Sequence, residues 1–371
     1  MELGVLRETL RDERRVGLTP DAVRALVADG HEVVVETRAG RASGFDDNEY
    51  RAAGAEIAFS ANEVAANTSV LLKVRTPTPE ELELLAGGRV LLGFLHMAHG
   101  SEQLVQALVD TGSTGISLEL VQEGPTRSVI EPLSQIGGRI AVSLAQYALT
   151  VGGGGPGTLL GGWVGVPAQR VVVIGAGVAG RAAAQEAMNL AAQVTVLDID
   201  PRPLHLTATK LGKHCVTAIA SPYNIASAVE AADVVIGAVA RPGLPAPRVL
   251  TRQHLRTMHP GSLFVDLSID EGGCAETSRP STLEDPIYVD EGVRHMCVPN
   301  LPAVVPRTAS QALSIAMLPY LRLLARRGLD RALRDSPGLA QGVGVYRGQL
   351  TSRHVAQFHG GEATPLEELL R

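Results

Sequence analysis

Three glycines, Gly175, Gly177 and Gly180, have the GxGxxG spacing that is typical of the turn between a strand and a helix at a dinucleotide site. They follow the apolar run at 171–174, and Asp198 ends a second apolar run roughly 20 residues further on. Gly175 would permit a tight turn, Gly177 would let the backbone approach a pyrophosphate, and Gly180 would let the helix pack closely on the strand. The pattern predicts a dinucleotide site; the alternative is an ordinary strand–turn–helix whose glycines serve packing alone.

The residues around this turn indicate which dinucleotide would bind. The backbone N–H groups of Val178 and Ala179, at the predicted helix start, would donate to the phosphates. Asp198 would accept hydrogen bonds from the adenosine ribose and would repel a 2′-phosphate, which favours NAD over NADP. Arg202 is either a contact to a phosphate or the adenine, or a solvated charge at the start of the next helix.

Four further polar residues have the types needed for chemistry on an amino acid, which requires a carboxylate anchor, a base for the amine and a group that polarises the later carbonyl. Lys73 interrupts the apolar strand pattern at 69–74, and such a charge is rarely buried without a partner, which favours function. His96 and Asp270 each end a predicted strand, where ligand sites form in α/β proteins, but a structural histidine and an Asx-turn explain them equally well. Arg15 lies in the charged run RDERR, where its position alone favours a surface charge.

Strand-like and helix-like segments alternate along the chain, which predicts an α/β fold with a parallel sheet. A helix is expected to begin at Pro20 after a Thr19 N-cap, a second to span 101–110, and two longer ones to end near Thr150 and to span 308–325. The tail at 326–371 is expected to be polar and partly helical. The predicted strands are 4–8, 31–37, 69–74, 89–95, 115–120, 170–175, 193–200, 215–220, 232–239, 262–269 and 296–300.

The chain has 371 residues, enough for about two domains. A long helix followed by a glycine-rich stretch that ends near Gly165 suits a crossover between domains, and the C-terminal helices could return to the first unit. We therefore expect a Rossmann-type dinucleotide-binding domain at 129–306, inserted in a discontinuous α/β substrate domain formed by 1–128 and 307–371.

Composition disfavours several classes of protein. The formal net charge of -6 disfavours a nucleic-acid or polybasic membrane partner. The charged N-terminus does not resemble a signal peptide, and no apolar run reaches the ~20 residues of a membrane span, so we expect a cytoplasmic protein. Three cysteines without a CxxC pair argue against a disulfide scaffold, and no metal site is predicted.

Several segments together resemble the alanine dehydrogenase family, and the resemblance spans nearly the whole chain; the similarity to the first domain of proton-translocating transhydrogenases is weaker. The resemblance implies reversible oxidative deamination of L-alanine to pyruvate and ammonia with NAD, by an assembly that is commonly a hexamer. The segments are GVLRETLRDERRVGLTP at 4–20, LLKVRTP at 71–77, FLHMA at 94–98, PLSQIGGR at 132–139, VIGAGVAG at 173–180, VDLSIDEGGCAETSRPS at 265–281 and VPNLPAVVPRTAS at 298–310.

The resemblance also implies roles on the substrate side. Arg15 would grip the substrate carboxylate, and Lys73 would contact its carboxylate or carbonyl oxygen. His96 would be the acid/base group, since an imidazole exchanges protons near neutral pH. Asp270 would orient the attacking water or ammonia and stabilise a cationic iminium.

On the cofactor side, the resemblance implies contacts from three more residues. Ser134 would contact the pyrophosphate, Ala240 would lie along the cofactor by its backbone, and Asn300 would lie at the nicotinamide end.

Four positions depart from the family pattern. Gln135 and Leu133 stand where Glu and Met are usual, and Trp163 lies in a loop that normally reads GGVPGV. His99 is either a second ring beside His96 or the cap of the next helix, with the cap preferred. The departures keep open a dehydrogenase for another small amino acid or imine; a non-enzymatic, transhydrogenase-like NAD-binding subunit is a further alternative.

Overall fold

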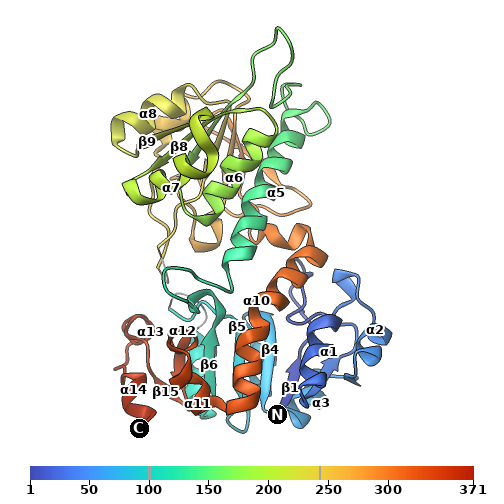
Figure 1. Cartoon of the computed structure of the whole chain (residues 1–371). Coiled ribbons are helices and arrows are strands. Elements are labelled where there is room, and N and C mark those ends of the chain that lie inside the picture. The colour runs from blue at the N-terminus through green and yellow to red at the C-terminus, as the bar shows by residue number, and fades with distance from the viewer. Residues whose placement is uncertain (99, 101, 242–243) are drawn as a thin grey trace. The chain divides into compact units, whose positions relative to one another are not determined.

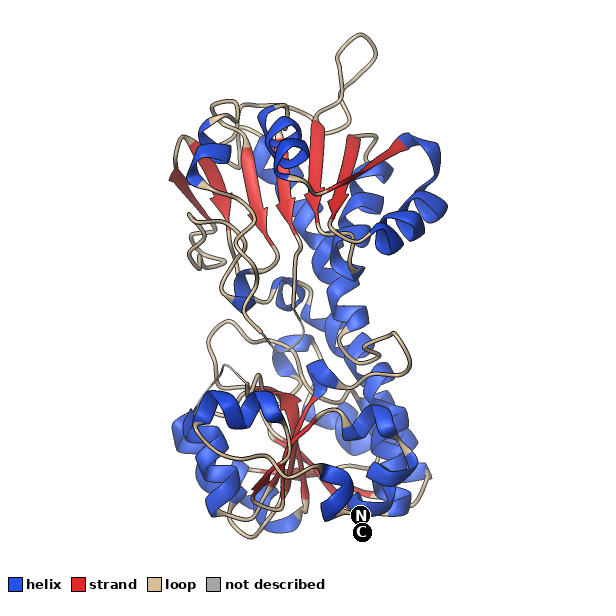
Figure 2. Ribbon diagram, turned by 90° about the vertical axis from the view of Figure 1, so that its left-hand side faces the viewer, coloured by secondary structure: helices blue, strands red, loops and turns tan. Residues whose placement is uncertain are grey.

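The structure is a computed structural model that describes residues 1–98, 100, 102–241 and 244–371. The chain forms two compact units (Figure 1). The first unit comprises residues 1–133 and 303–371, and the second comprises residues 134–302. Each unit has its own sheet with helices beside it (Figure 2), which confirms the predicted two-domain α/β class.

The sheet of the first unit has the strand order β15-β14-β6-β5-β4-β1-β2-β3. Its central strands pair in parallel, while β14 pairs antiparallel with β6 and β15 pairs antiparallel with β14. The strands are β1 (Glu2–Val5), β2 (Glu32–Glu36), β3 (Glu56–Ala58), β4 (Val70–Arg75), β5 (Val90–Phe94), β6 (Thr114–Ser117), β14 (Val343–Tyr346) and β15 (Gln349–Leu350). The helices are α1 (Pro20–Ala28), α2 (Asp47–Ala52), α3 (Ala61–Asn67), α4 (Glu102–Asp110), α10 (Pro306–Arg327), α11 (Leu329–Asp335), α12 (Pro337–Ala340), α13 (Arg353–His359) and α14 (Leu366–Leu369).

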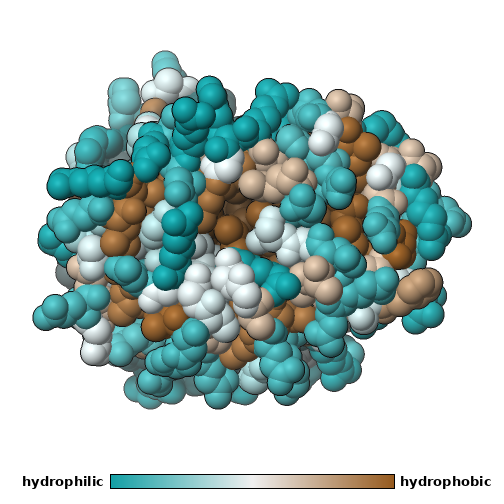
Figure 3. Space-filling model, turned by 90° about the horizontal axis from the view of Figure 1, so that it is seen from below, coloured by the Kyte–Doolittle hydropathy of each residue, from teal (hydrophilic) through white to brown (hydrophobic). Residues whose placement is uncertain are grey.

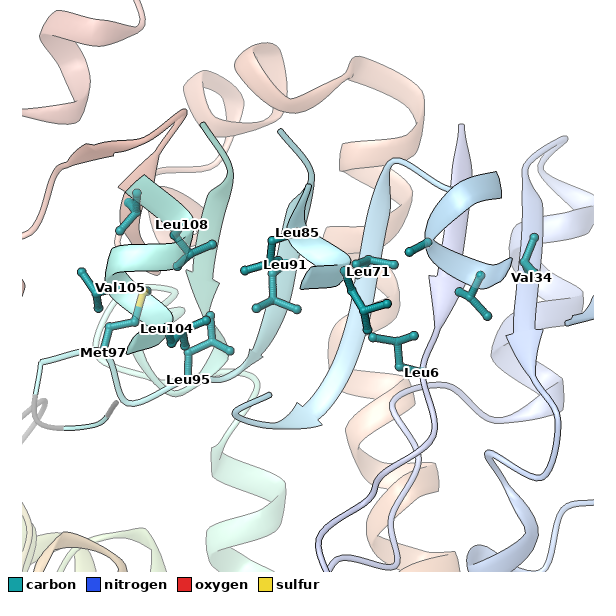
Figure 4. Packing of buried hydrophobic residues seen from close by; sticks show 14 of the residues in the cluster. Leu6, Val34, Leu71, Leu85, Leu91, Leu95, Met97, Leu104, Val105 and Leu108 are labelled. Carbon is teal, nitrogen blue, oxygen red and sulfur yellow. The ribbon is translucent and has the colours of Figure 1, made fainter. Parts of the chain in front are cut away.

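The central strands of this sheet are buried on both faces, which is why they read as continuous apolar runs. One core cluster contains Leu71 of β4 and Leu91 of β5 together with Leu104 and Leu108 of α4 (Figure 4). The face seen in Figure 3 shows mostly hydrophilic side chains with apolar ones between them, as on most protein surfaces.

The sheet of the second unit has the order β12-β13-β11-β10-β7-β8-β9, and only the edge strand β12 is antiparallel to its neighbour. Helix α5 (Glu131–Leu149) leads into this unit. The strands are β7 (Arg170–Ile174), β8 (Gln193–Asp198), β9 (Cys215–Ile219), β10 (Val234–Gly237), β11 (Leu263–Asp266), β12 (Ile287–Asp290) and β13 (Val293–Met296). The remaining helices are α6 (Val178–Asn189), α7 (Pro201–Leu211), α8 (Pro222–Glu230) and α9 (Arg252–Arg256).

Both sheets reverse their strand order at one point, between β1 and β4 in the first unit and between β7 and β10 in the second. Ligands of open α/β sheets bind beyond the carboxyl ends of the strands at such a switch point. The fold therefore points to the segments after β1, β4 and β5 in one unit, and after β7 and β10 in the other.

Several predicted elements were wrong in detail. The predicted strand at 296–300 is mostly outside the sheet, because the chain pairs instead as the β12–β13 hairpin, whose turn uses positive φ angles at Glu291 and Gly292. The predicted first strand at 4–8 begins earlier, as β1. The tail, expected to be only partly helical, also supplies β14 and β15, which are too short to show a clear alternation. Of the described residues, no helix is both long and apolar enough to cross a membrane.

Truncating a buried leucine of the first unit tests this packing. Leu91 is 1% exposed, so we expect Leu91→Ala to lower the free energy of unfolding by about 2–5 kcal/mol, through lost burial and a residual cavity. Leu10→Ala, at a position 40% exposed, is the matched control and should change it by less than about 1 kcal/mol. Urea unfolding followed by circular dichroism measures both; equal losses would contradict the packing.

Candidate active site

The three basic residues predicted for the substrate side lie at one edge of the first sheet. Lys73 belongs to β4, and His96 follows the end of the neighbouring strand β5. The guanidinium of Arg15 lies 5.8 Å from the ring centroid of Phe94, the last residue of β5. The structure thus brings Arg15, Lys73 and His96 to the carboxyl edge beside the switch point between β1 and β4.

Lys73 is a buried cation with carboxylate partners. Its side chain is inaccessible to solvent, and Nζ lies 2.9 Å from Oε1 of Glu81 and 3.7 Å from Oε2 of Glu8. Nζ also donates to the backbone oxygen of Arg7 at 3.2 Å. An unpaired ammonium would be very costly here, so Glu81 compensates the desolvation of Lys73.

Glu8 is the second carboxylate beside Lys73. It accepts hydrogen bonds from the backbone N–H groups of Val74, at 2.6 Å, and Arg75, at 3.3 Å. Burial raises the pKa of Glu8 from 4.5 to about 7, although the charge of Lys73 acts in the opposite direction. Glu8 is therefore partly protonated near neutral pH, and Glu81 carries the negative charge that balances Lys73.

Arg15 is buried, contrary to the surface position that its place in a charged run favours. Its Nε and Nη2 donate to the two carboxylate oxygens of Glu13 at 2.8 and 2.7 Å, and its backbone N–H donates to the same carboxylate. Burial acts to raise the pKa of Glu13, but the hydrogen bonds and charge of Arg15 hold that pKa below its ordinary value. This bidentate pair fixes the plane of the guanidinium.

His96 has an unusual backbone conformation for a residue with a side chain. Its φ angle is 46°, in the left-handed region, and its backbone N–H donates to Oε1 of Glu119 at 2.9 Å. The imidazole is partly exposed. His99, predicted to be a second ring or a helix cap, lies outside the described residues.

The glycine turn of the second unit has the geometry that its spacing predicts. Gly175 has a φ of 106°, and a Cβ there would collide with the backbone of Ala238 after β10. A Cβ at Gly180 would collide with the backbone oxygen of Gly175, so close packing of α6 on β7 requires glycine. A Cβ at Gly177 would meet nothing within 4 Å, which leaves the start of α6 open to a ligand.

The residues after β8 lie beside this turn. Oδ2 of Asp198 accepts the backbone N–H of Ala176 at 2.6 Å, and Oδ1 accepts that of Asp200 at 2.9 Å. Arg202 is bound by Asp200, with Nη2 2.6 Å from Oδ2, and its side chain is 88% exposed. In this structure Arg202 is thus a solvated charge at the start of α7. Val178 and Ala179 form the first turn of α6.

Asp270 and Asn300 are adjacent, although they lie far apart in the sequence. The backbone N–H of Asn300, whose φ is 55°, donates to Oδ2 of Asp270 at 2.9 Å. The hydroxyl of Ser268 binds both the backbone oxygen and N–H of Val239, at 2.7 and 3.1 Å, next to Ala240. These bonds connect the loop after β10 with the loop after β11.

The loop that carries Asp270 is held by Asp266, a residue that the sequence analysis did not single out. Asp266 is 1% exposed and accepts the backbone N–H groups of Ser268 and Cys274, both at 2.9 Å, and the hydroxyl of Ser278. The signal in the sequence that could have identified Asp266 is an acidic residue at the end of an apolar strand. Ser134 lies on α5, and no cluster of three or more metal-binding side chains occurs in the part of the chain that the structure describes.

The second sheet, with its glycine turn and with Asp198 at the end of β8, has the features of the Rossmann class of dinucleotide-binding folds. Comparison with known proteins is more specific. Residues 4–137 match the family model "Alanine dehydrogenase/PNT, N-terminal domain", and residues 141–353 match "Alanine dehydrogenase/PNT, C-terminal domain". The chain therefore belongs to the alanine dehydrogenase/PNT family.

Individual relatives agree with this assignment. The chain is 41% identical over 374 residues to alanine dehydrogenase of Staphylococcus haemolyticus, with full coverage of both chains. A solved structure of L-alanine dehydrogenase matches with a TM-score of 0.91 and 39% identity, over 97% of this chain and 99% of that one. A transhydrogenase structure from Sinorhizobium meliloti matches with a TM-score of 0.81 and 27% identity, over 95% and 99% of the two chains.

Two glycine substitutions test the geometry of the turn. We expect Gly180→Ala to destabilise the second unit, because the new methyl group meets backbone atoms that cannot rotate away. Gly177→Ala is the matched control, since its methyl group meets open space and its φ of -65° suits alanine. Thermal unfolding measures both variants; a Gly177→Ala protein that loses more stability than Gly180→Ala would contradict the geometry.

The raised pKa of Glu8 predicts a pH dependence of stability. Between about pH 4.5 and 7 the folded chain keeps a proton that the unfolded chain has released, so this group lowers the free energy of unfolding as the pH rises. We expect Glu8→Gln to remove that decrease in the free energy of unfolding. The pKa shift of Glu8 limits the decrease to about 3 kcal/mol. Urea unfolding at pH 5 and pH 7.5 measures it, with Glu56→Gln, at an exposed position, as the control. Parallel pH profiles for the Glu8→Gln and unmodified proteins would contradict the assignment.

Proposed function

We propose that this protein catalyses the reversible oxidative deamination of L-alanine to pyruvate and ammonium with NAD. The observation that carries the proposal is the gathering of Arg15, Lys73 and His96 at one sheet edge, in a chain whose full length matches proteins named alanine dehydrogenase. These groups would supply a carboxylate anchor, a positive charge and a proton acceptor. The residues at 1–128 and 307–371 would bind the substrate, and those at 129–306 would bind NAD.

The glycine turn of the second unit would be the place where NAD binds. The open start of α6 at Gly177 would receive the pyrophosphate on the N–H groups of Val178 and Ala179, with Ser134 as a further contact. Asp198 would accept hydrogen bonds from the ribose hydroxyls, and its charge would disfavour a 2′-phosphate. When bound, NAD supplies the acceptor for the hydride that leaves Cα of alanine.

The first unit would hold the amino acid. Glu13 fixes the Nε edge of Arg15, so the Nη1 edge is the part of the guanidinium that can bind the substrate carboxylate. Lys73, kept charged by Glu81, would stabilise the negative charge that develops on the carbonyl oxygen.

Proton transfer would fall to His96. The ammonium group of alanine would first lose a proton, and loss of the hydride from Cα would then leave a cationic iminium. Water would add to the iminium carbon and lose a proton, which gives a carbinolamine. The nitrogen would then gain a proton and leave as ammonia, while the hydroxyl loses its proton and becomes the C=O group. His96 would accept and return these protons, and Asp270 would orient the water and stabilise the cationic iminium. Asn300, bound to Asp270, and Ala240 would line the nicotinamide end.

The direct assay mixes the protein with NAD and L-alanine at alkaline pH and follows NADH absorbance, with pyruvate plus ammonium and NADH as the reverse test. A panel of alanine, serine, glycine and 2-aminobutyrate decides the substrate, since Leu133 is buried and could reshape an apolar pocket. If the protein turns over another amino acid of the panel faster than alanine, that amino acid replaces alanine as the proposed substrate. Trp163 is 77% exposed, so it gives no reason to expect a changed pocket within the chain.

Hexameric assembly and a cytoplasmic location complete the proposal. Light scattering measures the number of chains in the assembly.

Removing the imidazole separates an enzyme from a binding subunit. We expect His96→Ala to lower kcat by about 10²–10⁴, the usual contribution of a positioned acid/base group, and to leave NADH binding unchanged. His205→Ala, an exposed histidine on α7, is the matched control. An unchanged turnover in His96→Ala would argue for the transhydrogenase-like binding role instead.

A further inference from the structure

The backbone at His96 needs support. A left-handed backbone conformation is unfavourable for a residue with a side chain, and His96 adopts it with a φ of 46°. Glu119 supplies one source of that support, because its Oε1 accepts the His96 N–H at 2.9 Å. The same oxygen lies 3.9 Å from Nδ1 of the imidazole, which is beyond hydrogen bonding but close enough for a charge to act on the ring.

The sheet explains why these two residues meet. Strands β5 and β6 are parallel neighbours, with Gly93 opposite Ser117. His96 and Glu119 each follow the carboxyl end of their strand by two residues, so both project from the same edge. Glu119 lies in a 3-10 turn at Leu118–Leu120.

The carboxyl group of Glu119 is buried, and only one of its two oxygens forms a hydrogen bond within the described part of the chain. Its side chain is 8% exposed, and its Oε2 has no hydrogen-bond partner within the described part of the chain. A buried carboxylate with an unsatisfied oxygen is destabilising, and a neutral amide or hydroxyl could hold the His96 N–H equally well. An acidic side chain at this place therefore indicates a further task beside the imidazole, 3.9 Å from its Nδ1.

Two other titratable groups flank this turn. Nε2 of His359, on α13, lies 2.7 Å from the backbone oxygen of Met97, so that ring binds the chain rather than His96. Lys73, on the adjacent strand β4, is paired with Glu81. Within the described part of the chain, the structure thus places the Glu119 carboxylate against the His96 ring.

We propose that Glu119 is a positioning residue for His96: its carboxylate holds the His96 backbone, keeps the neutral ring protonated on Nδ1 and stabilises the imidazolium form. Nε2 is then the nitrogen that exchanges protons with the substrate. This inference rests on the proposed acid/base role of His96.

The experiment compares Glu119→Gln with Glu123→Gln. Glutamine keeps an oxygen for the His96 N–H and removes the charge, so the acidic limb of the kcat/KM–pH profile should move about one unit to lower pH, because the imidazolium loses its stabilisation. Glu123 is the matched control, since it lies on the same segment but accepts from Tyr320 at 3.3 Å. Its substitution should leave the limb in place. A limb that stays in place in Glu119→Gln would overturn the proposal.

A second readout does not depend on turnover. Nitrogen-15 NMR of labelled histidine, with the His96 signals assigned from His96→Ala, reports its titration midpoint and tautomer in the unmodified protein and in Glu119→Gln. We expect the Nδ1–H tautomer in the unmodified protein and a lower midpoint in the variant. A dominant Nε2–H tautomer, or equal midpoints, would refute the role of Glu119 even if the protein lacked alanine dehydrogenase activity. If Glu119→Gln does not fold, the tautomer in the unmodified protein decides.

Discussion

The pairing of each basic group at the first sheet edge with a nearby carboxylate is the interaction on which the candidate site depends. Glu81 balances Lys73, Glu13 clamps Arg15, and Glu119 holds His96. Without these partners, the desolvated Lys73 and Arg15 would be strongly destabilising. Glu13 belongs to the same segment as Arg15, whereas Glu119 follows a different strand from His96, so the latter contact forms only when β5 and β6 have paired.

In the second unit, buried hydrogen bonds hold loops without regular secondary structure in fixed positions. Asp266, at the end of β11, accepts several donors of its own loop, and Ser268 ties that loop to the one after β10. The backbone donors that would face a dinucleotide are therefore set by buried hydrogen bonds rather than by exposed side chains. Glycine is required at Gly175 and Gly180 because main-chain atoms occupy the space that a side chain would need.

Much of this arrangement could be predicted from the sequence where the signal is local. The apolar strands, the glycine turn and the charge inside the strand of Lys73 are all visible within a few residues. Glu81 and Glu119 could not be found in the same way, because each lies among polar or mixed residues and gains its importance from a partner brought close by folding. Glu13 is only two residues from Arg15, but nothing in the charged run distinguishes it from its neighbours. Arg15 shows the same limit, since its charged surroundings favour exposure and only the Glu13 clamp explains its burial. The short strands β12, β14 and β15 are defined by pairing rather than by pattern.

The pairing of β14 with β6 has a consequence for biosynthesis. Val345 and Val355 belong to the same core cluster as Leu71 and Leu91, so the first unit lacks part of its interior until these two residues have left the ribosome. The inserted unit, whose residues are contiguous, is synthesised completely before that point and can fold as a unit during translation. The first strands of the first unit therefore remain incompletely covered until β14 has been synthesised.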